Sequence, residues 1–328
     1  MVLDCGAVHV IDFRYYLVSI VSIFLALAVG IVLGAGPLQG DIGARLTQQM
    51  TALRADKTQL RTYLDAARRD AAARDTFSSA VAPAAMKDRL TGKTVALVVA
   101  PGVDSDLVKN VTTSLIAAGA KVGSTVTLSD VWADPSKITL RNTVASPFAT
   151  LATAPAAAGS PDQLAVTVLT HAILAGTDHS TERITASASA ALNGLAAGDL
   201  ISVTPDHVVP SSSVVFLSGP VKGSTQQDTD ARLAAYVQLV RSLDAAGSGV
   251  VVAAKSNSTD PTKSADLVAA ARKNSDAVKV ISTVDDADLP MGLNTLVMAL
   301  EQQYTGGAGQ YGLAGDAKAI VPDLTAKQ

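Results

Sequence analysis

The longest uninterrupted apolar stretch of the chain runs from Tyr15 to Leu38 and contains no charged residue. At a rise of about 1.5 Å per residue, a helix of this length crosses a hydrocarbon core of about 30 Å. Tyr15 and Tyr16 stand where aromatic residues gather at a membrane interface. The pattern predicts a single transmembrane helix over residues 15–38, preceded by an N-terminal extension over residues 1–14.

A cleaved signal peptide is the alternative interpretation of this stretch. Signal peptides have an apolar core of about 7 to 15 residues behind a basic start. Here the apolar run is longer, and Pro37 follows the small-residue pair Gly34 and Gly36. We therefore expect a retained anchor. Arg14 on one side and Arg45 on the other do not decide its orientation.

A charged helical pattern follows over residues 41–75. Leu46, Leu53 and Leu60 recur every seven residues, which is the heptad spacing of a coiled coil. The predicted interface consists of Leu46, Met50, Leu53, Lys57, Leu60 and Leu64. Lys57 at a core position favours a parallel homodimer over larger bundles. The alternative is one amphipathic helix that packs on the following domain.

Beyond a linker expected over residues 76–90, strands and helices alternate. The predicted strands are Thr94–Ala100, Lys121–Leu128, Val214–Leu217, Val250–Ala254 and Val278–Val284. The predicted helices are Asp104–Ala118, Pro161–Ala175, Thr181–Leu195, Thr229–Ala246, Ser264–Lys273 and Met291–Tyr304. This alternation predicts the α/β class, with one doubly wound, mainly parallel, Rossmann-like domain over residues 91–328.

The charge balance removes one class of partner. The formal net charge is −3 and the sequence pI is about 5.8, so the basic excess typical of nucleic-acid binding is missing. We therefore expect no nucleic-acid partner. The chain has one cysteine, Cys5, which excludes an internal disulfide or a pair of thiolate ligands.

The motifs of a nucleotide site or an enzyme are incomplete. The turn after the first strand, Pro101–Asp104, lacks G-x-G-x-x-G and puts the charge of Asp104 where a phosphate would sit. Gly92–Thr94 resembles the end of a Walker A loop but leads into a strand. Gly247–Gly249 precedes a strand, whereas a nucleophile elbow follows one. We expect no catalytic residue and no cofactor, hence a protein that is not an enzyme.

Potential metal ligands are scattered along the chain. The four histidines are His9, His171, His179 and His207. No Met-x-x-Met or Cys-x-x-Cys pair offers two soft ligands close together. A metal site needs several convergent donors, so these histidines are interpreted as structural or solvent-facing and no ligand set is assigned.

Acidic residues follow two of the predicted strands. Ligands bind beyond the carboxyl ends of strands in open α/β sheets, which draws attention to Asp104, Asp285 and Asp286. The three would lie along one edge if their strands were neighbours. With no base or nucleophile beside them, we expect polar anchors for a protein partner, and a hard-cation site is the alternative. Asn at 285 and 286 should then weaken partner capture without affecting folding.

Several segments resemble the actinobacterial MctB family. They are the apolar stretch from Ile11, the run Gly92–Gly102, the turn Ser282–Asp286 and the glycine-rich tail containing Tyr311 and Gly312. The family is described as a mycobacterial copper transporter or outer-membrane copper channel. The resemblance implies copper transport or efflux, copper homeostasis and copper ion as cargo, with the α/β domain outside the cytoplasmic membrane. Family members begin near the Ile-Asp-Phe-Arg run, which makes Cys5 a poor candidate for a copper ligand.

The resemblance and the residue pattern differ on mechanism. One apolar helix is not a pore, and a transmembrane barrel requires repeated segments of about 10 alternating residues, a pattern different from this one. Copper handling would be indirect or would require oligomers. The alternative function is a non-enzymatic dimeric scaffold that docks an envelope protein in cell separation or envelope maintenance. The single helix favours the cell membrane over an outer membrane.

Overall fold

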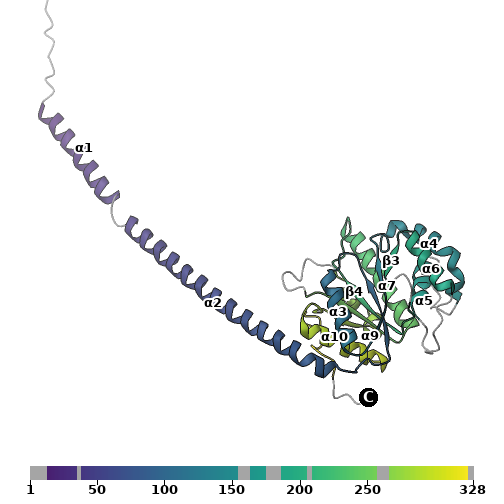
Figure 1. Ribbon diagram of the computed structural model, residues 1–328. Helices are drawn as coiled ribbons and strands as arrows, with labels where there is room; N and C mark the ends of the chain where they lie inside the picture. Colours follow the sequence, from purple (N-terminus) through teal and green to yellow (C-terminus); the bar gives the residue numbers. More distant parts are fainter. Residues whose placement is uncertain are drawn as a thin grey trace, which may run out of the picture. The chain divides into compact units, whose positions relative to one another are not determined.

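The computed structural model describes residues 13–34, 38–153, 163–174, 186–204, 209–256 and 266–323. The chain divides into two compact units, Met1–Ala72 and Ala73–Gln328 (Figure 1). The first unit holds the apolar helix and most of the long charged helix. The second holds a mixed α/β domain.

Helix α1, Phe13–Gly34, corresponds to the predicted membrane helix. It is long and apolar enough to cross a membrane, and none of its residues is buried within the chain. Its bounds differ from the predicted 15–38, because Leu38 opens the next helix and residues 35–37 lie outside the described part. A helix that is apolar on every face is stable in an apolar medium, so α1 has the length and composition of a membrane anchor.

Helix α2, Leu38–Met86, continues past the end predicted for the coiled coil. The segment expected to be a linker, residues 76–90, is helical as far as Met86, and Pro83 lies inside the helix near its end. Packing explains the extension. Within the second unit, one side of the helix is at least partly buried, and its residues recur at helical spacing: Asp75, Ser78, Ala82 and Met86. Tertiary contacts here outweigh the helix-breaking tendency of proline.

The last turns of α2 are held by α10, Pro290–Tyr304. The side-chain amide of Asn294 donates a hydrogen bond to the hydroxyl of Ser78 at 3.1 Å. Just beyond the helix, Arg89 forms a half-buried ion pair of 2.5 Å with Glu301. Residues 73–90 therefore belong structurally to the α/β domain.

The domain is built on one seven-stranded sheet in the order β3-β2-β1-β4-β5-β6-β7. The strands are β1 Thr94–Val99, β2 Lys121–Leu128, β3 Ile201–Thr204, β4 Ser213–Ser218, β5 Val250–Ala254, β6 Ser282–Val284 and β7 Gln310–Tyr311. All neighbouring pairs are parallel except β2 with β3. The predicted α/β class with a mainly parallel sheet is confirmed.

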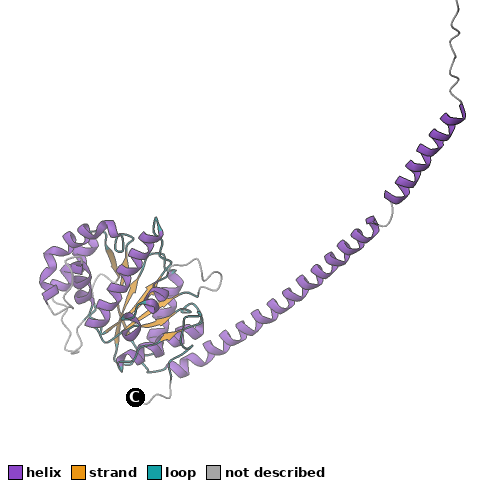
Figure 2. Cartoon of the chain, turned by 180° about the vertical axis from the view of Figure 1, so that it is seen from behind, coloured by secondary structure: helices purple, strands orange, loops and turns teal. Residues whose placement is uncertain are grey.

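Helices cover both faces of the sheet, and the strands appear between them in Figure 2. Val98, Phe216 and Val252 face one core, whereas Leu97, Leu217 and Val251 face the other. Successive residues of each strand point to opposite faces, and both faces are apolar. This is typical of a buried parallel sheet. The first core is covered by α5 Leu164–Ile173, α6 Ala186–Ala197, α7 Gln226–Ala246 and α8 Leu267–Lys273. The second is covered by α3 Ser105–Ala117 and α10.

One predicted strand is wrong over half of its length. Residues 278–284 divide into the short helix α9, Ala277–Val280, and the strand β6. Asn274 favours the helical turn, because its side-chain oxygen accepts hydrogen bonds from the backbone N–H groups of Asp276 and Ala277. The apolar run therefore begins in a helix and ends in a strand.

The irregular middle of the chain holds elements that the pattern did not predict. They are the 3-10 helices η1 Pro135–Lys137 and η2 Ser146–Thr153, helix α4 Ile138–Ala145 and the antiparallel edge strand β3. Asp134 caps η1 by accepting a hydrogen bond from the N–H of Ser136 at 2.8 Å. The buried guanidinium of Arg141 donates to the carbonyl of Asp134 at 2.8 Å. Arginine is usually found on the surface of a protein, so the sequence gives no indication that Arg141 is buried and holds this segment together.

Candidate functional site

The strand order reverses between β1 and β4, which is where open α/β sheets form a binding crevice. The loops that follow these strands touch one another, because a Cβ on Gly219 would lie 2.6 Å from the carbonyl oxygen of Pro101. A small cavity of 250 Å³ remains, lined by both loops and by Lys255. Gly219 thus permits loop-to-loop packing, which leaves little room for a large ligand.

Asp104 lies at this crevice and has a local role. Its carboxylate caps α3 by accepting a hydrogen bond from the N–H of Asp106 at 3.0 Å. It also faces the ammonium of Lys255 at 3.8 Å, and both side chains are at least half exposed. An exposed pair of this kind contributes little to stability. Asp104 is accessible to solvent.

Asp285 follows β6, which is separated from β1 by two strands, and it has a different environment. The guanidinium of Arg272 in α8 forms ion pairs with Asp285 at 2.7 Å and with Asp316 at 2.6 Å, and the Arg272 side chain is only 4% exposed. The same guanidinium donates to the hydroxyl of Thr283 at 2.9 Å and to the carbonyl oxygen of Tyr311 at 2.6 Å. We name Arg272, Thr283, Asp285, Tyr311 and Asp316 the Arg272 cluster.

The Arg272 cluster binds the C-terminal tail to the sheet. Asp285 accepts hydrogen bonds from the backbone N–H groups of Leu313 at 2.7 Å and Ala314 at 3.1 Å. Gly312 has a φ of +131°, and a Cβ on it would overlap the Asp285 carboxylate. Only glycine allows the backbone to pass so close to that side chain. A cavity of 650 Å³ adjoins the cluster, lined by Arg272, Asp285, Leu289, Leu313 and Asp316 among others.

Asp286 is the third acidic residue that the sequence singled out. Its side chain has no exposed surface, and Asp285 is only 9% exposed. The three carboxylates also do not share one site, because β4 and β5 separate β1 from β6. The prediction of three polar anchors on one exposed edge is therefore corrected for Asp285 and Asp286, which belong to the interior of the domain.

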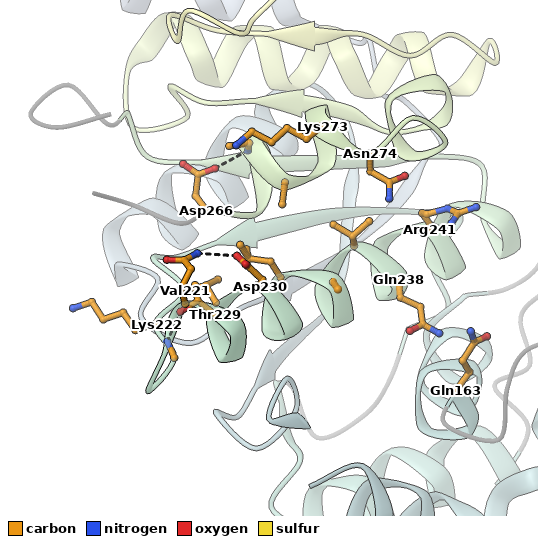
Figure 3. Close-up of a pocket in the computed structure, with 17 residues that line it drawn as sticks. Gln163, Val221, Lys222, Thr229, Asp230, Gln238, Arg241, Asp266, Lys273 and Asn274 are labelled. Atoms are coloured by element: carbon orange, nitrogen blue, oxygen red, sulfur yellow. Dashed lines mark hydrogen bonds between the residues drawn. The ribbon is translucent and has the colours of Figure 1, made fainter. Parts of the chain in front are cut away.

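A groove of 1050 Å³ lies on the outer side of α7 and α8 (Figure 3). Gln163, Gln238 and Arg241 gather at one end of it, and Lys222, Asp230 and Asp266 lie toward the other. Asp266 caps α8 through the N–H of Ala269 at 2.7 Å, and Asp230 accepts a hydrogen bond from Gln226 at 2.8 Å. Sequence reasoning gave no signal for this groove, because polar residues on helix surfaces resemble an ordinary solvated face.

Among the described residues, no group of three His, Cys, Asp or Glu side chains could hold a metal ion. Of the histidines, His171 lies in α5, where partial burial lowers its pKa. Cys5, His9, His179 and His207 lie outside the described residues. The sequence did not assign a ligand set, and the described part of the domain adds none.

Comparison with known proteins identifies the group to which the chain belongs. The model of the MctB family, described as "Copper transport outer membrane protein, MctB", matches residues 10–322. The chain belongs to the MctB family. Proteins named "Copper transporter MctB" from Mycobacterium tuberculosis H37Rv and Mycobacterium bovis AF2122/97 are each 28% identical over 320 residues, which cover 94% of this chain and 98% of the relative.

Two segments that carried the resemblance to the MctB family meet in the Arg272 cluster. The turn Ser282–Asp286 supplies Thr283 and Asp285, and the glycine-rich tail supplies the Tyr311 carbonyl. β6 and β7 pair through Thr283 with Gln310 and through Val284 with Tyr311. The match to the MctB family begins at residue 10, so Cys5 and His9 lie outside it.

The Arg272 cluster predicts a large effect of a small substitution. Asp285→Asn should lower the free energy of unfolding by about 3 kcal/mol, because it removes the more buried of the two carboxylates that pair with the Arg272 charge. The measurement is denaturant unfolding of the full chain in detergent, followed by fluorescence of Trp132, the single tryptophan, which is 2% exposed.

Asp104→Asn is the matched control, since it makes the same chemical change at an exposed ion pair. It should alter the free energy of unfolding by less than about 0.5 kcal/mol. Equal effects of the two substitutions would contradict the structural role of Asp285.

Proposed function

We propose that this protein takes part in copper transport in the cell envelope as a membrane-anchored, non-enzymatic component. The observation that carries the proposal is the match to the MctB family over residues 10–322. The helix α1 fits an envelope location, since it is long and apolar enough to cross a membrane. Copper is the cargo in this proposal.

The proposed topology is single-pass, with the α/β domain outside the cytoplasmic membrane. Large domains following a membrane helix translocate largely regardless of their charge. The apolar core of α1 is longer than that of an ordinary signal peptide, which favours its retention in the membrane. The domain then faces the compartment through which exported copper passes.

The proposed assembly is a homodimer through α2. Leu46, Met50, Leu53, Leu60 and Leu64 have exposed fractions from 47% to 67% within one chain. Lys57 is exposed as well. A row of large apolar side chains at heptad spacing is stable in water when a second helix covers it. A second copy of the chain supplies that helix in matching register.

Helix α1 offers a compatible face within the membrane. Ser22, Ala26, Gly30 and Gly34 follow one another at four-residue spacing. A Cβ placed on Gly30 or Gly34 would have no atom within 4 Å. Small residues at this spacing let membrane helices approach closely. This face supports the dimer that the heptads of α2 suggest.

The alternative function is a dimeric scaffold that docks an envelope protein in cell separation or envelope maintenance. One observation favours it: among the described residues no cluster of three His, Cys, Asp or Glu side chains could hold a metal. Soft ions such as Cu(I) prefer sulfur and imidazole donors. The scaffold would therefore contribute to the envelope without holding the ion.

A copper measurement distinguishes these functions. During copper exposure, cells that lack the protein should contain at least about twice as much cell-associated copper as unaltered cells, because copper efflux is reduced. Mass spectrometry of washed cells gives the copper content, and zinc content in the same samples is the control. Restored copper content on complementation with the full chain supports the proposal. Unchanged copper with altered division would favour the scaffold.

The topology gives a second expected outcome. The full-length chain should remain in the membrane fraction with its N-terminus intact, because α1 is retained. Protease added outside spheroplasts should degrade the α/β domain while a cytoplasmic marker protein survives. A mature chain that begins near Pro37 and leaves the membrane fraction would contradict anchoring.

The dimer predicts the effect of changing the heptad. Replacing Leu53 and Leu60 with Gln should convert dimers into monomers, since each substitution removes a core position of the coiled coil. Light scattering of the detergent-solubilised chain measures the mass, and Trp132 fluorescence should show an unchanged α/β domain. Thr51→Gln and Thr58→Gln, at exposed positions of the same helix, are the control. A monomer before any substitution would exclude the dimer.

A further inference from the structure

Asp286 is a buried acid that the domain does not pair. It lies between the end of β6 and the start of α10, and its side chain has no exposed surface. Neither of its carboxylate oxygens has a hydrogen-bond partner among the described residues. A carboxylate in this position has lost its hydration, and the weak contact with the N–H of its own residue does not replace it, which disfavours the ionised form.

The neighbouring charges increase this effect. The carboxylates of Asp285 and Asp288 both raise the pKa of Asp286, and Arg272 is the cation that faces it. The Arg272 guanidinium is already bound by Asp285 and Asp316. Asp288 is itself occupied, because it accepts hydrogen bonds from the N–H and hydroxyl of Ser256 at 2.6 Å and 3.0 Å. Burial, followed by the repulsion of Asp285, raises the pKa of Asp286 to about 6.

Helix α10 lies directly against this acid. A Cβ on Gly292, in the first turn of α10, would overlap the carbonyl oxygen of Asp286 and lie 2.7 Å from its Oδ1. The backbone N–H of Leu289 donates to that carbonyl at 2.9 Å. A hydrated carboxylate needs more space than this packing leaves, so ionisation and close packing of α10 oppose each other.

The same helix holds the end of α2. Asn294, two residues after Gly292, donates to Ser78, and Glu301 pairs with Arg89 further along α10. Both contacts join α10 to residues 73–90. A displacement of the first turn of α10 would therefore act first on the contact between Asn294 and Ser78.

We propose that Asp286 is a proton-operated switch that sets how firmly the last turns of α2 are held against the α/β domain. In the protonated state α10 packs on the neutral carboxyl and holds Ser78. Loss of the proton favours a state in which the start of α10 opens, the carboxylate reaches water and the hold on Ser78 weakens. The switch concerns regulation of the link between the helix and the domain, and it does not depend on copper as the cargo.

The sign of the pH dependence follows from the raised pKa. The packed state binds the proton more tightly than the opened state, in which the acid has its ordinary pKa. The stabilisation of the packed state is therefore complete at low pH and is lost as pH rises toward and through about 6. Opening should increase about tenfold between about pH 5 and pH 7, as linkage gives for an ordinary carboxyl in the opened state.

Hydrogen exchange of the full chain in detergent tests the switch. After correction for the intrinsic pH dependence of exchange, opening of residues 286–294 and 78–86 should rise together by this factor. Asp286→Asn should abolish the rise in both segments. Asp244→Asn is the matched control, because burial also raises the pKa of Asp244 in α7 to about 6. That variant should keep the full response.

The possible outcomes separate clearly. A rise that persists in Asp286→Asn overturns the proposal, and so does a rise confined to residues 286–294 without residues 78–86. Should Asp286→Asn fail to fold, the unaltered chain and Asp244→Asn decide by infrared spectroscopy. A protonated-carboxyl band that titrates near pH 6 in Asp244→Asn, together with the exchange response, supports the switch. Absence of that band overturns it.

Discussion

A guanidinium that is sealed inside a protein must find acceptors for its charge, and Arg272 obtains them from distant parts of the chain. Asp285 comes from the end of β6, whereas the Tyr311 carbonyl and Asp316 come from the C-terminal tail. Removing either set would leave the buried cation with too few acceptors, which is among the costliest defects in a folded domain. The position of the tail, the short strand β7 and the need for Gly312 all follow from this requirement. Because Arg272 is bound by Asp285 and Asp316, it forms no ion pair with Asp286.

The domain also shows how little a fold class says about function. Its strand order and its crevice between β1 and β4 are those of many nucleotide-binding proteins. At that crevice, Gly219 lets two loops touch, and Asp104 caps the helix to which a phosphate would otherwise bind. The fold class indicates no function by itself, whereas the MctB family and the apolar helix α1 do. Among the described residues, most of the exposed large apolar side chains lie on α1 and α2.

Sequence patterns predicted the elements whose signals are local. β2 and β5 have the predicted bounds, and α3 lies between its cap Asp104 and Gly119, which has a positive φ. These elements combine an apolar run with clear start or stop residues. By contrast, β7 has two residues and exists because its neighbours hold it. The extension of α2 to Met86 likewise depends on a surface that another part of the chain provides. Asp285 was found as a candidate, but its role depends on Arg272, whose burial no local pattern reveals.

The Arg272 cluster also has a consequence for the order in which the chain acquires its structure. Arg272 leaves the ribosome 39 residues before Tyr311 and 44 residues before Asp316. The apolar helix α1 is synthesised long before either, so it is complete while the sheet still lacks its last strand. Until the tail arrives, Arg272 has to stay in water, and the parts of α8 and β6 around it cannot close. Translation of the tail therefore marks the moment at which the domain can become compact, and a chain interrupted before it remains open to proteases.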